Sequence, residues 1–206
     1  MAWQDVLGQY YTEIERVNRE INQTSVLKAI DILYEAWESG KTVFSMGNGG
    51  SASTASHFAS DLAKFTLVPG QRGFKVSCLN DNIPLVSAWT NDSGFGSIFV
   101  GQLEPWLEKD DVIVGFSVHG GSGLGDAGPW SQNLVQAMDL AKNRGAKIIG
   151  LSGFDGGAMG EMADVSLVVP VHSEPLATPL IESYHVVLHH LICLGLKERI
   201  GSLVNG

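Results

Sequence analysis

The chain has 206 residues and a formal net charge of −9, and 44% of its residues are hydrophobic. That hydrophobic content excludes a disordered chain, and an acidic balance without any run of Lys or Arg disfavours a nucleic-acid-binding protein. The two cysteines, Cys78 and Cys193, lie in apolar runs without a CxxC spacing, which indicates reduced thiols in a cytoplasmic protein. We find neither a signal peptide nor an apolar run long enough for a membrane span, so no membrane partner is expected.

The N-terminal region predicts two helices. Residues 2 to about 22 carry Val6, Tyr10, Ile14 and Val17 at spacings of three and four, which is typical of an amphipathic helix. A second helix follows and ends at Gly40. Because the first helix precedes the rest of the fold, its apolar stripe must be buried somewhere, and we expect residues 1–40 to form contacts between copies of the chain.

Residues 41–206 alternate between strands and helices. Continuous apolar runs predict buried strands at Thr42–Met46, Phe74–Leu79, Val112–Phe116, Lys147–Leu151 and Val165–Val169. Helical patterns at Ser51–Phe65 and Leu134–Asn143 lie between them, and a long C-terminal helix spans about Pro179 to Ile200. The alternation predicts a doubly wound α/β domain with a five-stranded parallel sheet, and residues 1–206 are expected to form one domain. Ligands of such sheets bind at the carboxyl ends of the strands.

A glycine-rich loop follows the first predicted strand and reads Gly47-Asn48-Gly49-Gly50-Ser51. Glycines let a backbone approach a ligand closely, and the free amides at a helix start favour an anion. The loop formally matches the dinucleotide fingerprint GxGxxG/A, but the acidic residue that this fingerprint requires is not at the expected distance. A tight strand-to-helix turn without a ligand is the other interpretation. The sequence lacks the GxxxxGK[ST] motif, which excludes a nucleotide P-loop.

Histidine and carboxylate side chains occur on two predicted helices. His57 and Asp61 are four residues apart and therefore share a helix face, where they either bind one metal ion or hydrogen-bond to each other. The C-terminal helix carries Glu182 with three histidines, and imidazole with carboxylate suits zinc and similar divalent ions. At 100° per residue, His189 lies about 20° from Glu182 and His190 about 80°, so spacing alone favours His189.

Five segments together resemble the phosphoheptose (sedoheptulose 7-phosphate) isomerase family of sugar-isomerase (SIS) domains. They are GNGGSASTASHFASDL, TNDSGFGSIFVGQLEPWLEKDDVIVGFS, AKNRGAKIIGLSG, ADVSLVVP and TPLIESYHVVLHH. The resemblance covers nearly the whole chain and implies a flavodoxin-like three-layer sandwich with extra N-terminal helices, assembled as a homotetramer. It also implies isomerisation of a sugar phosphate, with a metal that is typically zinc.

The resemblance assigns roles to residues by position. The metal ligands fall on His57, Asp61, Glu182 and His190, so the resemblance prefers His190 to His189. Asp61 is the first candidate for the catalytic base, Glu182 is the second, and His190 is a ligand or acid partner. Substrate contacts fall on Asn48, Gly49, Ser51, Asn91, Asp92, Ser117, His119 and Ser131.

The chain departs from the family pattern at two places. The family usually has Glu at position 61 and Gln at position 182, where this chain has Asp61 and Glu182. In the phosphate loop, His119 replaces a serine, and an insertion of about nine residues, Ser122–Trp130, precedes the helix that starts near Ser131. We expect the insertion to reshape the substrate pocket, and the alternative is a passive surface loop.

These observations predict a cytoplasmic, metal-assisted aldose–ketose isomerase. The expected substrate is sedoheptulose 7-phosphate, the expected product is D-glycero-D-manno-heptose 7-phosphate, and the reaction would pass through an enediol. The alternative is a non-catalytic SIS-domain binding protein, either a sugar-phosphate sensor or a protein that associates with a replication initiator. Such a protein would need the tetramer and a surface patch but no metal.

Overall fold

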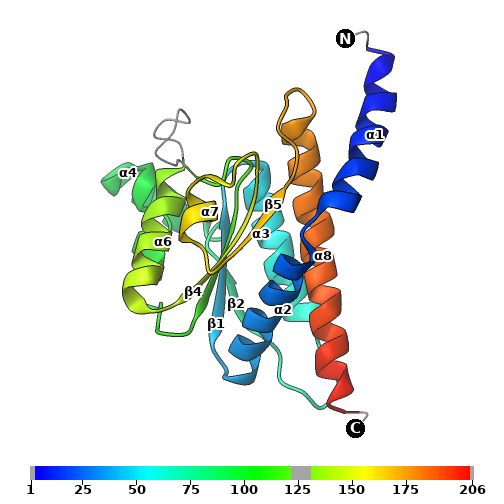
Figure 1. Cartoon of the computed structure of the whole chain (residues 1–206). Coiled ribbons are helices and arrows are strands. Elements are labelled where there is room, and N and C mark those ends of the chain that lie inside the picture. Colours follow the sequence, from blue (N-terminus) through cyan, green and yellow to red (C-terminus); the bar gives the residue numbers. More distant parts are fainter. Residues whose placement is uncertain (1–2, 122–130, 205–206) are drawn as a thin grey trace.

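The computed structural model describes residues 3–121 and 131–204. Five parallel strands form one sheet in the order β2-β1-β3-β4-β5. They are β1 (Thr42–Gly47), β2 (Lys75–Cys78), β3 (Val112–Phe116), β4 (Lys147–Gly153) and β5 (Val165–Val169). The chain winds outward in both directions from β1 and β3, so the predicted doubly wound α/β fold is confirmed (Figure 1).

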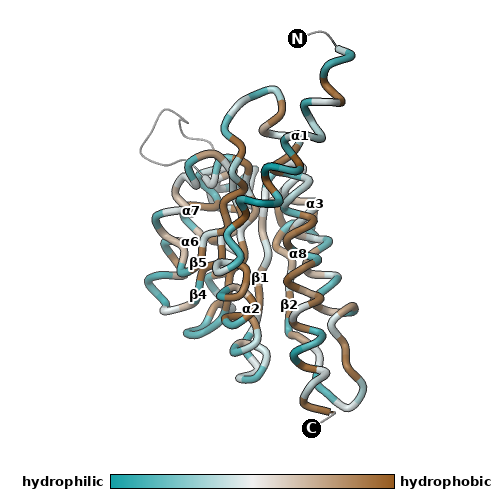
Figure 2. The backbone as a smooth tube through the Cα atoms, turned by 45° about the vertical axis from the view of Figure 1, so that its right-hand side comes forward, coloured by the Kyte–Doolittle hydropathy of each residue, from teal (hydrophilic) through white to brown (hydrophobic). Residues whose placement is uncertain are grey.

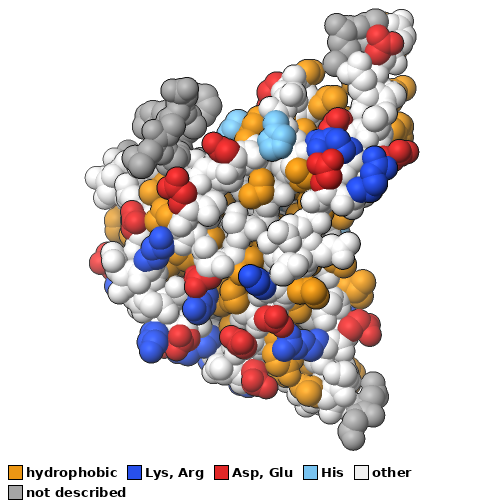
Figure 3. Space-filling model, in the orientation of Figure 1, with side chains coloured by type: hydrophobic (Ala, Val, Ile, Leu, Met, Phe, Trp, Pro, Cys, Tyr) orange, Lys and Arg blue, Asp and Glu red, His pale blue; other side chains and the backbone are white. Residues whose placement is uncertain are grey.

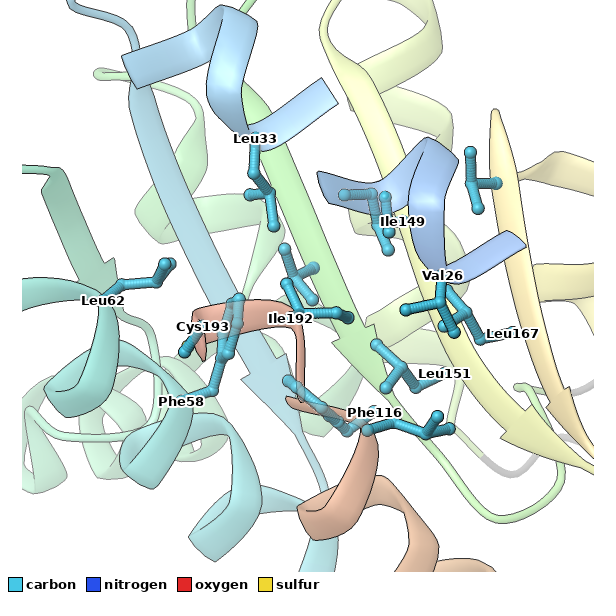
Figure 4. Close-up of a cluster of buried hydrophobic side chains, with 14 of the residues drawn as sticks. Val26, Leu33, Phe58, Leu62, Phe116, Ile149, Leu151, Leu167, Ile192 and Cys193 are labelled. Carbon is cyan, nitrogen blue, oxygen red and sulfur yellow. The ribbon is translucent and has the colours of Figure 1, made fainter. Parts of the chain in front are cut away.

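Helices cover both faces of the sheet and make three layers. One face carries α2 (Gln23–Glu38), α3 (Gly50–Ser60), the π-helix η1 (Asp61–Phe65) and α8 (Ala177–Ser202). Figure 4 shows how this layer packs, with Val26 and Leu33 from α2, Phe58 from α3 and Ile192 from α8 directed toward Phe116, Ile149, Leu151 and Leu167 of the strands. The predicted alternation of buried strands and apolar helix faces thus produces a continuous core.

The other face carries a second set of helices. They are α4 (Ile83–Ser93), the 3-10 helix η2 (Phe95–Ser97), α5 (Val100–Leu103), α6 (Gln132–Arg144) and α7 (Gly157–Met162). The core on this side contains Phe99, Leu134 and Met138, all buried. Asn82 caps α4 by accepting a hydrogen bond from the Leu85 amide (3.1 Å), and Gly145 ends α6 in the left-handed conformation.

Two elements differ from what the sequence pattern predicts. Strand β2 is shorter than the apolar run suggests, and Lys75 and Ser77 on it are exposed because β2 is an edge strand. Helix α4 has no buried residue, and its Val86 and Trp89 are only partly buried against the core. The insertion at Ser122–Trp130 lies outside the described residues.

Helix α1 (Asp5–Glu20) lies against α8 at one end and projects from the molecule at the other (Figure 1). The Tyr184 hydroxyl of α8 donates to the Ile14 carbonyl (2.8 Å) and lies 3.0 Å from Asn18 Oδ1. Trp3, which precedes the helix, and Tyr11 are 77% and 65% exposed. Hydrophobic side chains are visible along this projecting segment in Figure 3.

Helix α8 is hydrophobic over much of its length (Figure 2). Its 26 residues meet the length and apolarity of a membrane span, but half of the most apolar window is buried inside the fold. A core helix of a soluble protein meets the same criteria. The helix therefore gives only weak support for a membrane span.

Candidate metal centre and active site

The glycine loop after β1 takes its shape from side-chain contacts and from close approaches. Asn80 holds both backbone groups of Gly47, accepting from its amide (3.1 Å) and donating to its carbonyl (2.9 Å). Gly49 has a φ of 57°, a conformation that costs glycine little. A Cβ at Gly50 would lie 2.5 Å from Glu182 Oε1, so only glycine allows the α8 carboxylate to approach the start of α3.

Asn48 joins this loop to the start of α6. Its side-chain nitrogen donates to Asn133 Oδ1 (3.0 Å), and the Asn133 nitrogen donates back to Asn48 Oδ1 (2.8 Å). Asn133 is fully buried. The Asn48 nitrogen also lies 3.4 Å from Ser131 Oγ. Two loops that we expected to contact substrate are therefore fixed to each other across the carboxyl edge of the sheet.

Four side chains from α3, η1 and α8 converge on one point. They are His57, Asp61, His189 and His190, and one potential ligand atom of each lies within 4.8 Å of the others. Asp61 Oδ2 is 3.6 Å from His57 Nε2, 3.6 Å from His189 Nδ1 and 3.3 Å from His190 Nε2. The His57 and His190 Nε2 atoms are 3.4 Å apart. The predicted i, i+4 pair, His57 and Asp61, does meet the histidines of the C-terminal helix.

This group fits a tetrahedral metal ion. Zinc bonds of about 2.0–2.2 Å place tetrahedral ligand atoms about 3.4 Å from one another, and the four distances above are close to that value. His189 is fully buried, and neither of its ring nitrogens has a hydrogen-bond partner among the described residues. A buried imidazole nitrogen without a partner is costly, and a metal bond would satisfy it.

The electrostatics of the group favour metal binding as well. Burial, followed by the neighbouring His190 and His57, lowers the pKa of His189 to about 3, so its imidazole stays neutral as a ligand requires. Burial, followed by the charge of Asp61, raises the pKa of the nearby Cys193 thiol to about 12. The Cys193 thiol therefore stays protonated, and the ligands available to a metal here are imidazole and carboxylate groups.

The helix type changes at Asp61. α3 ends at Ser60 and the chain continues as a π-helix from Asp61 to Phe65. Such turns insert one extra residue into a helix and are frequent at functional sites. Asp61 is at the junction, and its side chain is 18% exposed while those of His57 and His190 are about half exposed. The group thus has a buried side at His189 and an open side toward solvent.

Glu182, the remaining expected ligand, does not belong to this group of four. It is half-buried two turns earlier on α8, with its carboxylate against Gly50. His189 occupies the group instead, together with His190. Helical spacing favoured His189 and the resemblance favoured His190. Both imidazoles lie near Asp61, because the two residues are adjacent on α8.

The expected substrate residues occupy two regions. Ser51 and Ser117 are buried near the ends of β1 and β3, and Ser117 Oγ accepts from the Gly121 amide (3.2 Å). His119 is exposed in the loop after β3. By contrast, Asn91 and Asp92 are exposed on α4, where Asn91 donates to Asp92 Oδ1 (2.7 Å).

Comparisons with known proteins show the family to which this chain belongs. The SIS domain family matches residues 9–153. The phosphoheptose isomerase of Aliarcobacter butzleri is 34% identical over 84% of this chain and 85% of its own length. The chain belongs to the phosphoheptose isomerase family of SIS-domain proteins.

Two further relatives refine this assignment. The lincomycin biosynthesis protein LmbN of Streptomyces lincolnensis is 51% identical over 92% of this chain and 68% of its own length. The structure of phosphoheptose isomerase GmhA from Neisseria gonorrhoeae superposes with a TM-score of 0.79 and 25% identity, covering 93% of this chain and 95% of that one. The resemblance inferred from the sequence, and the fold it implies, are confirmed.

Sequence reasoning missed two residues of this region. Asn133 lies two residues after Ser131, and no motif distinguishes it from other helix-start amides. Phe154 follows β4 and has a φ of 51°. A positive φ at a phenylalanine depends on the contacts around it, so the sequence could not indicate it.

Proposed function

We propose that the protein is a metal-assisted aldose–ketose isomerase that converts sedoheptulose 7-phosphate to D-glycero-D-manno-heptose 7-phosphate through an enediol. One observation carries the proposal: Asp61 and three imidazoles converge at a spacing suited to a divalent ion, and His57 is on the helix that begins at the glycine loop. Membership of the phosphoheptose isomerase family supports the same reaction class.

His57, Asp61, His189 and His190 would hold the metal, for which zinc is our choice because imidazoles supply three of the four ligands. When bound, the metal would polarise the oxygens on the first two substrate carbons. His189 replaces Glu182 in the ligand set that the resemblance implies. Glu182 is then free for proton transfer.

Isomerisation needs one base that acts on two neighbouring carbons. The base removes a proton from C1 of the ketose, and the enediol then receives a proton at C2, while the hydroxyl proton passes from O1 to O2. Asp61 lies within 3.6 Å of three imidazoles, so ligation engages its carboxylate. Glu182 lies outside that group against the glycine loop, and we assign the proton transfer to Glu182.

The phosphate and the sugar chain would bind along the carboxyl edge of the sheet. The amides at the start of α3, the Ser117 and Ser131 hydroxyls and the His119 imidazole supply hydrogen-bond donors there. In the loop that contains Asn48, Gly49 and Ser51, the glycine would let the backbone approach the substrate closely. Asn91 and Asp92 stay proposed substrate contacts.

We further infer that residues 1–206 form a single domain that works as a cytoplasmic homotetramer. Exposed apolar residues on two helices support the assembly, because water-exposed stripes of this kind need a partner. They are Leu7 and Tyr11 on α1 and Val187, Leu191 and Leu194 on α8.

The 51% identity to LmbN favours a second candidate. That value exceeds the 34% identity to the A. butzleri phosphoheptose isomerase. The alternative is the same isomerisation on a different sugar phosphate, in a biosynthetic pathway such as that of lincomycin. The replacement of a family serine by His119 near the phosphate supports a change of substrate.

A panel assay tests both candidates. Purified protein is incubated with keto- and aldo-sugar phosphates of different chain length, with and without chelator, and the products are separated. Chelator-sensitive conversion of the heptose phosphate supports the first candidate, and faster conversion of another sugar phosphate supports the second. If no sugar phosphate in the panel is converted, the isomerase proposal is wrong and the binding-protein alternative gains support.

A further inference from the structure

His119 and Phe154 form a stacked pair between two loops. His119 lies in the loop after β3 and Phe154 in the loop after β4, and their ring centroids are 4.5 Å apart with an interplanar angle of 17°. Phe154 is partly buried and packs against the core, whereas His119 is exposed. Stacking covers one face of the imidazole and leaves the edge that carries its nitrogens available for hydrogen bonds.

The two loops are joined by backbone contacts. The Met159 amide donates to the Gly120 carbonyl (2.8 Å), and the Gly153 amide donates to the Val118 carbonyl (3.0 Å). A Cβ at Gly120 would lie 1.9 Å from the Gly156 carbonyl oxygen, so any larger residue would separate the loops. This frame fixes the position of the stacked pair relative to the strand ends.

Phe154 occupies an unfavourable backbone conformation. Its φ of 51° is in the left-handed region, which is sterically unfavourable for a residue with a Cβ atom. Glycine would adopt this φ without the cost, yet the chain has a large aromatic residue. Backbone strain of this kind is concentrated at functional sites, which indicates a role for the phenyl ring at this position.

The pair is at the edge where the substrate is expected. A Cβ at Gly153, next to Phe154, would lie 2.2 Å from Ile181, the neighbour of Glu182 on α8. Figure 3 shows histidine side chains exposed at this end of the molecule. The described parts of the loops after β1, β3 and β4 and at the start of α6 contain no Lys or Arg. His119 therefore brings an imidazole N–H donor to these loops.

We propose that Phe154 is a positioning residue that holds the His119 imidazole where a ring nitrogen donates a hydrogen bond to the phosphoryl group of the substrate. The inference rests on the proposed function, because a sugar phosphate is the ligand that brings a phosphoryl group to this edge. It assigns Phe154 a role in substrate affinity that packing alone would not require.

The test measures binding rather than turnover. Isothermal titration with inorganic phosphate and with sedoheptulose 7-phosphate is carried out on metal-free protein. His119→Phe keeps the stack and removes the donor, and Phe154→Leu keeps apolar bulk without a flat ring. Each variant is expected to bind both ligands about tenfold more weakly than the wild type does. Phe154→Tyr keeps the stack, and His172→Phe alters another exposed histidine, so both variants should bind like the wild type.

A double-mutant cycle separates positioning from general loosening of the loop. If Phe154 acts through His119, the double variant His119→Phe/Phe154→Leu binds phosphate no more weakly than either single variant. In turnover assays, KM should rise while kcat changes less than twofold. Additive losses in the cycle, full affinity in His119→Phe, or no phosphate binding by the wild type would each overturn the inference. Binding without isomerisation would overturn the proposed function and leave this inference standing.

Discussion

The side-chain amides of Asn48 and Asn133 hydrogen-bond to each other in both directions, at 2.8 and 3.0 Å. One residue belongs to the glycine loop after β1 and the other to the first turn of α6. Neither amide needs water or a ligand to satisfy these bonds. The pair therefore holds at a fixed separation the two segments that we propose contact the substrate.

Asn133→Ala should lower both stability and substrate affinity. The substitution removes two hydrogen bonds and leaves the Asn48 amide without them, which costs about 1–3 kcal/mol of unfolding free energy. KM for the sugar phosphate should rise because the glycine loop loses its anchor to α6. Urea denaturation and steady-state kinetics measure the two effects. Asn143→Ala, at an exposed position of the same helix, is the control and should change stability by less than about 0.5 kcal/mol.

Metal content should distinguish His189 from Glu182. His189→Ala removes a ligand and should lower the zinc bound per chain, whereas Glu182→Ala, which leaves no ligating side chain at this position, should keep the metal and lose most of kcat. Elemental analysis after purification without chelator gives the stoichiometry, and the assay gives kcat. If Glu182→Ala loses the metal and His189→Ala keeps it, the ligand set is the one that the resemblance implies. If the wild type contains no stoichiometric metal and keeps full activity in EDTA, the metal proposal is wrong.

Acid should destabilise the metal-free protein through His185. This residue is fully buried on α8, and burial lowers its pKa from 6.5 to about 4. Between these values the unfolded chain binds the proton that the folded chain excludes. The stabilisation is therefore present above pH 6.5 and is lost as the pH falls toward 4. Linkage gives about 2 kcal/mol between pH 7 and pH 5 from this residue.

Urea denaturation at the two pH values measures this effect. His185→Leu should reduce the loss on acidification by that amount, while His172→Phe, at an exposed histidine, should leave it unchanged. An equal acid effect in His185→Leu and in the wild type would mean that other groups account for it.

The apolar stripe on α8 should hold copies of the chain together. Leu191 is 48% exposed in one chain, so Leu191→Lys should barely change the stability of the chain itself. A lysine at a packed interface would lack a partner, and the tetramer should dissociate. Light scattering with size-exclusion chromatography measures the mass, and Phe95→Lys, at an exposed residue away from α8, is the control. A wild-type monomer at micromolar concentration would contradict the assembly.

Much of the sheet could be predicted from the sequence because both faces of its central strands are covered. The run Val112–Phe116 coincides with the central strand β3, whose five residues are all buried, and the run Val165–Val169 coincides with β5, an edge strand with three of its five residues buried. By contrast, β2 is an exposed edge strand and α4 has no buried residue, so apolar patterning describes them poorly. The strand order was beyond local patterns, since it depends on which helices cover which face.

The candidate site was predictable where helical spacing determines it. The i, i+4 spacing placed His57 and Asp61 on one face, and they do lie together with the histidines of α8. Spacing could not reveal that His189 and His190 both reach Asp61, because that depends on how α8 packs against α3 and η1. The position of Glu182 against Gly50 depends on a close approach of two helices, which no local pattern encodes.

Isomerisation in deuterated water, with and without chelator, tests the central claim most directly. A base that exchanges protons with solvent should return deuterium to C2 of the aldose product, which mass spectrometry and proton NMR detect. We predict conversion of sedoheptulose 7-phosphate with deuterium at C2, abolished by EDTA and restored by zinc. Conversion at an unchanged rate in EDTA would contradict a metal-assisted reaction, and a product without deuterium at C2 would contradict proton transfer by a base that exchanges with solvent.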